Sequence, residues 1–355
     1  MITTQNLLKE IKKALDDCQT FHCVIVDSEV YNKEITDSTI ACPGLRNLAW
    51  LEPEEGIYII NLEIMLHFKN KMTSITRLFK ELINTGHLVV SKRYKVPQYL
   101  PKFQFDKKIK KQTYIALVTL FSPNAQIDLW VSFIKNMYIP KNTKLGIYIG
   151  NNTGCKNLQE TIKNKLKKFT HKYDTLEILD LGKPYKSKIN ANYFEVNKHA
   201  HVAMCYSNIL KELVDYYDYI LKLEDDMNPP KEGLKNLFSK MKILEKSKKV
   251  ASVAGVYRQK ADPEFACISM QPVVWGKTPK IENIPFKTFE VKMQGGGFAL
   301  YNSLALKECL PYRLTFKLPG GNYYMTGWDG TLGEDLSTNG WTQYCDGSLY
   351  CEHIF

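Results

Sequence analysis

From residue 113 onward, apolar residues fall into short continuous runs that alternate with longer stretches of helical spacing. A continuous run is typical of a strand buried on both faces, whereas recurrence every three or four residues is typical of an amphipathic helix. The predicted strands are 113–121 (TYIALVTLF), 145–152, 175–182 and 219–223, and the predicted helices are 127–139, 157–169 and 195–217. Because strands and helices alternate through short connections, we expect an α/β fold with a mainly parallel sheet flanked by helices.

Residues 1–108 follow a less regular pattern. Strands are predicted at 22–28, 56–64 and 87–96, and helices at 7–15 and 74–84. We interpret this part as a smaller N-terminal α/β domain whose role the sequence does not assign. Two prolines and a lysine run in 97–111 oppose regular structure, so we expect a linker there and a second domain at 109–355.

The predicted strand at 219–223 runs directly into three consecutive carboxylates, Glu224, Asp225 and Asp226. In parallel sheets, ligands bind at the carboxyl ends of the strands, where this triplet lies. Three neighbouring carboxylates repel one another, and a divalent cation relieves that repulsion. Mg²⁺ and Mn²⁺ prefer oxygen ligands and often bridge carboxylates to a substrate diphosphate. An acidic turn before a helix at 228–241 is the alternative.

Two later stretches add candidate chemistry. QGGGFALYNSLALKECLPY (294–312) contains three adjacent glycines, which let a backbone approach a ligand closely. GWDGTLGEDLSTNGW (327–341) places three acids between two tryptophans, an arrangement that suits a sugar, since apolar ring faces stack on tryptophan and carboxylates accept hydrogen bonds from hydroxyls. A flexible turn and an ordinary polar loop are the respective alternatives.

Taken in order, these motifs resemble glycosyltransferases of the GT-A fold. The likeness covers about 113–355 and is greatest to family-2 enzymes and to galactosyl- and N-acetylgalactosaminyltransferases. The acidic triplet resembles the DxD motif of that family, with Glu224 at its first position. The resemblance implies that Glu224 and Asp226 bind the metal and that His353, in CEHIF (351–355), completes the metal shell.

The resemblance also implies a donor site and a catalytic base. The donor contacts would come from strand ends, the glycine segment and one tryptophan: Thr119, Phe121, Ser122, Asp180, Asp225, Gly295, Gly296, Gly297 and Trp328. Asp335 is expected to be the base of an inverting transfer. Four residues separate Trp328 from the Gly-Glu-Asp, more than in the compact form of the family motif, so Glu334 and Asp329 stay as alternative bases.

Composition restricts the partners and the cellular compartment that we expect for the protein. The net charge is +11, from 48 Lys and Arg against 37 Asp and Glu. Such a charge attracts anionic partners. No nucleic-acid-binding motif accompanies it, so nucleic acid is not expected, while contact with an anionic membrane surface stays open. The nine cysteines form no CxxC pair, and the N-terminus shows no signal-peptide pattern, so we expect a cytoplasmic protein.

The sequence thus predicts a metal-dependent glycosyltransferase, a hexosyl- or pentosyltransferase, with Mn²⁺ or Mg²⁺ as cofactor. Its expected donor is a nucleotide-diphosphate sugar, with a UDP-sugar favoured over a GDP-sugar, and its acceptor a hydroxyl of a glycan, glycoprotein or other molecule. One alternative is a sugar-nucleotide pyrophosphorylase, although SPNAQ (122–126) lacks the Gly-rich basic loop of such enzymes. The other is a non-enzymatic module that binds nucleic acid or an anionic surface.

Overall fold

The computed structural model describes residues 23–26, 58–61, 103–105, 108–109, 111–181, 196–260, 262–271, 278–310, 312, 315–317, 323–325 and 327–354. Two predicted N-terminal strands are found as β1 (Cys23–Val26) and β2 (Tyr58–Asn61), which pair in antiparallel register. The predicted strand at 87–96 and the predicted helices at 7–15 and 74–84 lie outside the described residues.

The chain divides into two compact units. One comprises residues 1–96, 186–203 and 313–331, and the other comprises 97–185, 204–312 and 332–355. In the first unit, β13 (Thr315–Lys317) and β14 (Tyr323–Met325) form a second antiparallel pair. A separate N-terminal domain with its boundary near residue 108 stays a prediction.

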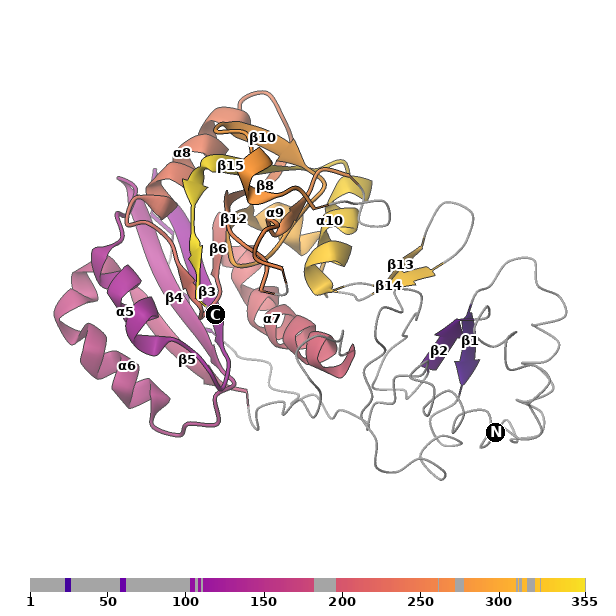
Figure 1. Cartoon of the computed structure of the whole chain (residues 1–355). Coiled ribbons are helices and arrows are strands. Elements are labelled where there is room, and N and C mark those ends of the chain that lie inside the picture. Colours follow the sequence, from indigo (N-terminus) through magenta and orange to yellow (C-terminus); the bar gives the residue numbers. More distant parts are fainter. Residues whose placement is uncertain are drawn as a thin grey trace, which may run out of the picture. The chain divides into compact units, whose positions relative to one another are not determined.

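The second unit is built on an eight-stranded sheet (Figure 1). Its strands, from one edge to the other, are β10 (Thr288–Val291), β15 (Thr342–Tyr350), β8 (Val250–Val256), β12 (Phe298–Asn302), β6 (Tyr219–Leu223), β3 (Thr113–Phe121), β4 (Thr143–Asn151) and β5 (Thr175–Asp180). Neighbours are parallel except where β12 or β10 is involved. The expected mainly parallel sheet is therefore confirmed, and the four strands predicted after residue 113 are β3, β4, β5 and β6.

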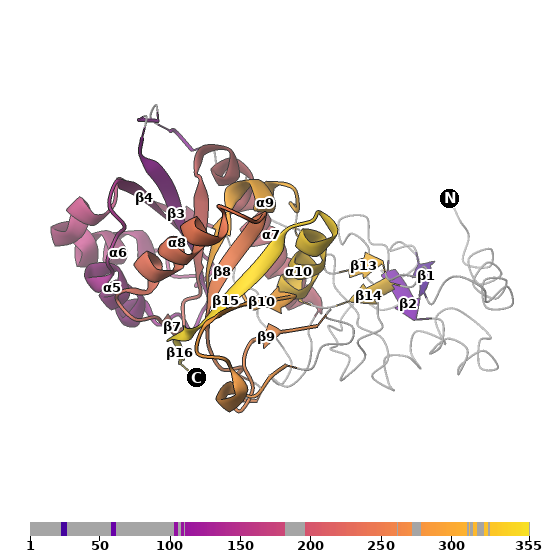
Figure 2. The same cartoon turned by 90° about the horizontal axis from the view of Figure 1, so that it is seen from above.

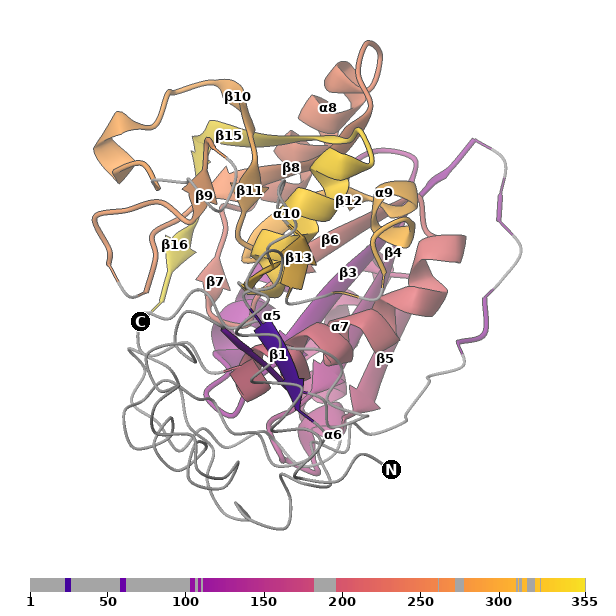
Figure 3. The ribbon, with the colours of Figure 1, turned by 90° about the vertical axis from the view of Figure 1, so that its right-hand side faces the viewer.

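Helices cover both faces of the sheet. The helices are α5 (Ile127–Asn136), α6 (Leu158–Leu166), α7 (Val196–Tyr216), α8 (Gly233–Leu244), α9 (Ser303–Lys307) and α10 (Trp328–Thr338), with short 3-10 segments at Lys167–Lys172 and Ile281–Asn283. Helices α5, α6 and α8 share one hydrophobic core with the sheet. Figure 3 shows α7 on the opposite face, where Ile209 lies against Gly150 of β4. Among the described residues, none of the helices combines the length and apolarity that crossing a bilayer requires.

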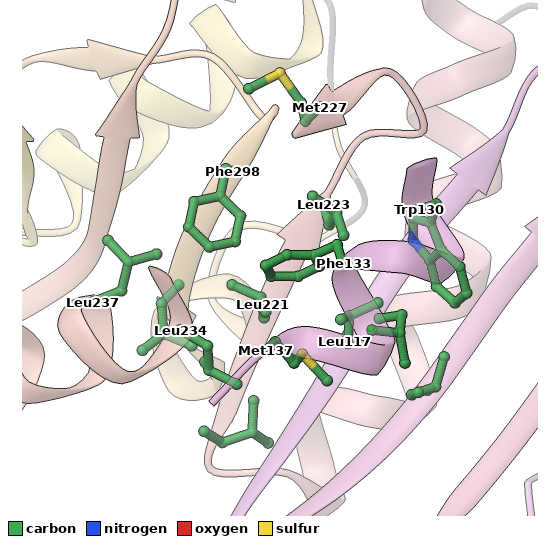
Figure 4. Close-up of a cluster of buried hydrophobic side chains, with 14 of the residues drawn as sticks. Leu117, Trp130, Phe133, Met137, Leu221, Leu223, Met227, Leu234, Leu237 and Phe298 are labelled. Atoms are coloured by element: carbon green, nitrogen blue, oxygen red, sulfur yellow. The ribbon is translucent and has the colours of Figure 1, made fainter. Parts of the chain in front are cut away.

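The hydrophobic core beneath α5 and α8 holds β6, the strand that leads directly into the acidic triplet. Figure 4 shows Leu221 and Leu223 of β6 beside Phe133 of α5 and Phe298 of β12. The rings of Phe133 and Phe298 meet edge to face, with centroids 5.9 Å apart. Full burial of such a side chain stabilises a fold by about 1.5–3 kcal/mol. The last residues of β6 are thus held firmly just before the triplet begins.

Part of the predicted linker packs against the second unit. The Phe105 ring stacks on Tyr216 at the end of α7, with centroids 4.3 Å apart and planes inclined by 10°. The Phe103 ring meets Tyr148 of β4 edge-on, with centroids 4.8 Å apart. Residues 103–105 therefore serve as an aromatic anchor within this unit.

Phe105→Ala is expected to lower the free energy of unfolding by about 1–3 kcal/mol, because it removes a stacked ring that is half-buried. Chemical denaturation followed by circular dichroism measures the change. Phe286→Ala is the matched control, since Phe286 is 85% exposed and its loss should change the stability by less than about 0.5 kcal/mol. Equal losses for the two variants would contradict the anchoring role of Phe105.

Candidate active site

The acidic triplet follows β6, and its members face different surroundings. Asp225 is 7% exposed, whereas Glu224 and Asp226 are half-buried. The Asp225 carboxylate accepts hydrogen bonds from the backbone N–H and the Oγ–H of Ser122, both at 2.7 Å. Burial raises the pKa of Asp225, although these two hydrogen bonds oppose the rise. Asp225 thus ties the end of β6 to the end of β3 and leaves its two neighbours to face the edge of the sheet.

His353 reaches the triplet through a short strand pair. Strand β16 (Glu352–His353) pairs with β7 (Met227–Asn228), and the two lie side by side in Figure 2. The backbone N–H of Ile354 also donates to the Asp226 carbonyl at 2.9 Å. The register places His353 opposite Met227, one residue after the triplet.

The imidazole of His353 is oriented by its surroundings. Its Nδ1 lies 2.7 Å from the Arg258 carbonyl oxygen, and because a carbonyl only accepts, Nδ1 carries the hydrogen. Nε2 lies on the other side of the ring, 3.5 Å from Oδ1 of Asp226. Tyr257 packs edge-on against the ring, with centroids 5.5 Å apart. Metal-binding histidines commonly donate their second ring N–H to a carbonyl in this way.

The three residues predicted to bind metal come together. Ligand atoms of Glu224, Asp226 and His353 all lie within 4.8 Å of one another. Oδ1 of Asp226 is buried and accepts no hydrogen bond from the part of the chain that the structure describes. Carboxylate oxygens with one imidazole nitrogen suit a divalent cation such as Mn²⁺. The donor set therefore fits the expected metal, and metal binding itself is a proposal.

Basic groups hold the Asp226 carboxylate ionised. Burial alone would raise the pKa of Asp226, but the His353 side chain and the Lys260 ammonium bring that pKa below its usual value. Burial would likewise lower the pKa of His353, yet Asp226 and the Arg258 carbonyl raise it. Lys260 forms a salt bridge with Oδ2 of Asp226.

Sequence reasoning missed the segment that supplies Tyr257, Arg258 and Lys260. It follows β8, which runs in the same direction as β6 and so ends at the same edge of the sheet. The signal was the continuous apolar run VASVAGV at 250–256, followed at once by polar residues.

The glycine segment supports the site through Tyr257. The Glu224 N–H donates to the Gly297 carbonyl, and the Gly297 N–H donates to the Tyr257 hydroxyl, both at 2.8 Å. A Cβ on Gly297 would lie 2.6 Å from Cζ of Tyr257, and a Cβ on Gly295 would also collide with that side chain. Gly296 lies between them. The glycines are therefore needed at least for the close approach of Tyr257, and their predicted contact with a donor stays a prediction.

The predicted donor residues on the first strands fall into two groups. Thr119 and Phe121 are fully buried, and the Thr119 hydroxyl accepts a hydrogen bond from the Trp130 indole at 2.9 Å. Ser122 and Asp180 lie at the strand ends, and the register of β3, β4 and β5 brings those ends side by side. Donor binding by these four residues stays a prediction.

The GWDGTLGED stretch forms helix α10 and is not a loop. Trp328 is 5% exposed, and the Asp329 carboxylate accepts a hydrogen bond from the Gly330 N–H at 2.9 Å. Glu334 and Asp335 are half-buried. Consecutive helical residues point about 100° apart, so these two acids face different surroundings. The role of base for any of the three acids stays a prediction.

No family model matches this sequence, and no curated protein matches it either. Among solved structures, the chain is similar to GalNAc-T7 with UDP, GalNAc and Mn²⁺, at a TM-score of 0.45 and 10% identity over 69% of this chain and 43% of that one. It is also similar to TarS 1–349 from S. aureus, at a TM-score of 0.41 and 11% identity over 68% and 60% of the two chains. A third is the mannosyltransferase PcManGT from Pyrobaculum calidifontis in complex with GDP-Man and Mn²⁺, at a TM-score of 0.41 and 10% identity over 69% and 58%.

The chain spans about half the length of the solved structures that it matches. The similarity to these structures is one of fold, as the expected resemblance implies. Their donors and metals are properties of those proteins.

Gly297→Ala is expected to lower the free energy of unfolding by about 1–3 kcal/mol, because the new methyl group must displace the Tyr257 ring. Thermal and chemical denaturation measure the loss. In a Tyr257→Ala background the ring is absent, so the same glycine substitution should cost much less, and a double-mutant cycle isolates the difference. Additive effects of the two substitutions would show that Gly297 and Tyr257 are independent.

Proposed function

We propose that this protein is a metal-dependent glycosyltransferase that moves a sugar from a nucleotide-diphosphate donor to an acceptor hydroxyl. The observation that carries the proposal is the convergence of Glu224, Asp226 and His353 at the carboxyl edge of the sheet. Two of them come from the end of β6 and the third from a strand more than a hundred residues later. The hydrogen bond of Nδ1 to the Arg258 carbonyl turns the imidazole so that Nε2 faces Asp226.

In this proposal Glu224, Asp226 and His353 hold Mn²⁺ or Mg²⁺. When bound, the cation would offset the negative charge that grows on the leaving diphosphate. Ser122 holds Asp225 inward, so the metal would be held by the two flanking carboxylates, Glu224 and Asp226, and not by Asp225. The neighbouring ends of β3, β4 and β5 offer Ser122 and Asp180 to the nucleotide, and a UDP-sugar is favoured over a GDP-sugar.

We assign the acceptor side to α10. A base must take a proton from the acceptor hydroxyl, and a carboxylate that does not bind the metal remains able to do so. Asp335 is the first choice, and Glu334 and Asp329 are the alternatives on the same helix. Transfer with inversion of the anomeric centre follows from such a base. The acceptor is a hydroxyl of a glycan, a glycoprotein or another molecule, and a cytoplasmic location stays a prediction.

Asp226→Asn tests the metal site. In thermal-shift measurements, UDP with Mn²⁺ should stabilise the wild-type protein by about 2.7 kcal/mol at a ligand concentration a hundred times the Kd. The Asn variant should keep its fold and lose the Mn²⁺-dependent part, because the amide carries no charge. Asp128→Asn is the matched control, since the Asp128 side chain is 86% exposed on α5 and outside the triplet.

The same measurement with UDP-, GDP-, CMP- and dTDP-sugars identifies the donor. Mn²⁺-dependent stabilisation that persists in Asp226→Asn would contradict the proposed metal site. Stabilisation by a nucleoside triphosphate together with a sugar 1-phosphate, and not by any nucleotide sugar, would favour a pyrophosphorylase. Steeply salt-dependent binding of nucleic acid would favour the binding module.

Asp335→Asn tests the base. The substitution is nearly isosteric and removes basicity, so turnover should fall by roughly 10²–10⁴-fold while donor affinity stays nearly unchanged. Steady-state transfer rates and donor titrations measure the two effects. Glu334→Gln and Asp329→Asn are assayed beside it, and the variant with the largest loss of turnover identifies the base. A product with the donor's anomeric configuration retained would overturn the inverting assignment.

A further inference from the structure

The Lys260 side chain occupies a position beside Asp226 that a bound metal ion would also use. Its ammonium group forms a salt bridge with Oδ2 of Asp226, one of the proposed metal ligands. The other carboxylate oxygen, Oδ1, faces Nε2 of His353 at 3.5 Å. Both oxygens of Asp226 therefore face basic groups of the chain itself. A divalent cation that uses Oδ2 of Asp226 has to displace the Lys260 ammonium.

The lysine differs from the proposed ligands in how firmly it is held. Asp226 has a side chain 16% exposed, and its backbone carbonyl accepts the Ile354 N–H. His353 is fixed through the Arg258 carbonyl and the β16–β7 pair. The Lys260 side chain is 55% exposed and ends a flexible four-carbon stem. Its head can therefore leave Asp226 while the ligands keep their positions.

Once displaced, the Lys260 ammonium needs a new anionic partner to replace its salt bridge with Asp226. A nucleoside diphosphate that binds at the same site together with the metal would supply phosphate oxygens as that partner. The Lys260 ammonium is a compact charge with three N–H donors on a flexible stem, so it suits either anion. Exchange of one anion for the other keeps the ammonium in an ion pair, whereas metal without a diphosphate would separate it from Asp226 with no replacement for that pair.

We propose that Lys260 is a counter-ion of the candidate metal site that holds Asp226 in the metal-free protein and passes to the diphosphate of the donor when metal and nucleotide bind together. This inference rests on the proposed function. It predicts that a free divalent cation binds weakly and that the nucleotide strengthens its binding, because the two ligands are coupled through one lysine. By linkage, the metal must strengthen nucleotide binding by the same factor.

Lys260→Met tests the inference by direct titration of Mn²⁺, with free Mn²⁺ measured by electron paramagnetic resonance. Without the competing ammonium, Mn²⁺ alone should bind about 5–150-fold more tightly than in the wild-type protein, the range typical of coupling between two ligands. The factor by which UDP strengthens Mn²⁺ binding should fall correspondingly. Lys260→Arg keeps the charge and should restore weak binding of Mn²⁺ alone.

Lys280→Met is the matched control. It removes the same charge from a lysine that pairs with Glu264 and lies outside the acidic triplet, so Mn²⁺ affinity should stay close to that of the wild type. Circular dichroism checks that each variant is folded, and Lys260→Gln serves if the methionine variant is not.

The outcomes separate this inference from the function on which it rests. If the wild type binds Mn²⁺ with UDP but Lys260→Met binds Mn²⁺ alone no more tightly, the inference is overturned and the metal site stands. An equal gain in Lys280→Met would also overturn it, since the effect would then be one of net charge. If no variant binds Mn²⁺ with or without UDP, both the inference and the proposed metal site are overturned.

Discussion

The burial of Asp225 is the constraint on which the site depends. A buried carboxylate beside two others is costly, and it is offset here by hydrogen bonds from both donors of Ser122. Such bonds to a charged group contribute roughly 1.5–3 kcal/mol each. The backbone of the triplet then serves three other segments: Gln126 at the start of α5 donates to the Asp225 carbonyl, Glu224 donates to Gly297, and Ile354 donates to the Asp226 carbonyl. The inward orientation of Asp225 thus determines how Glu224 and Asp226 are placed. It also positions the backbone of the triplet for its hydrogen bonds to the three other segments.

Tyr257 links the glycine segment to the histidine. Its hydroxyl accepts from Gly297 and its ring packs against His353, while the next residue offers the carbonyl that orients the imidazole. A side chain larger than hydrogen at Gly297 would displace the Tyr257 ring, and the displaced ring would press on His353, which packs against it. The glycines and the histidine, which are far apart in the sequence, are in this way parts of one packed arrangement.

The sequence predicted those strands that a local pattern of apolar residues encodes. Strands β3 and β6 were predicted with their observed bounds, because strands buried on both faces read as continuous apolar runs that end abruptly. The grouping of Glu224, Asp226 and His353 was predicted from family motifs. The contribution of Lys260 was not, because it acts through a contact across 34 positions that no local pattern reveals. Helix α10 was also missed, since its glycines and acids hide the apolar spacing of a helix.

The pairing of β16 with β7 has a consequence for the order of events during synthesis. The side chains of Asn228 and Glu352 meet at 2.9 Å across 124 positions of the chain. Domains form as their segments emerge from the ribosome, and a contact of this span cannot form until its later partner has been made. The acidic triplet therefore emerges long before its histidine. A nascent chain can complete strands β3 to β6 while the proposed cation site still lacks His353, so the three candidate ligands come together only after nearly the whole second unit has been translated.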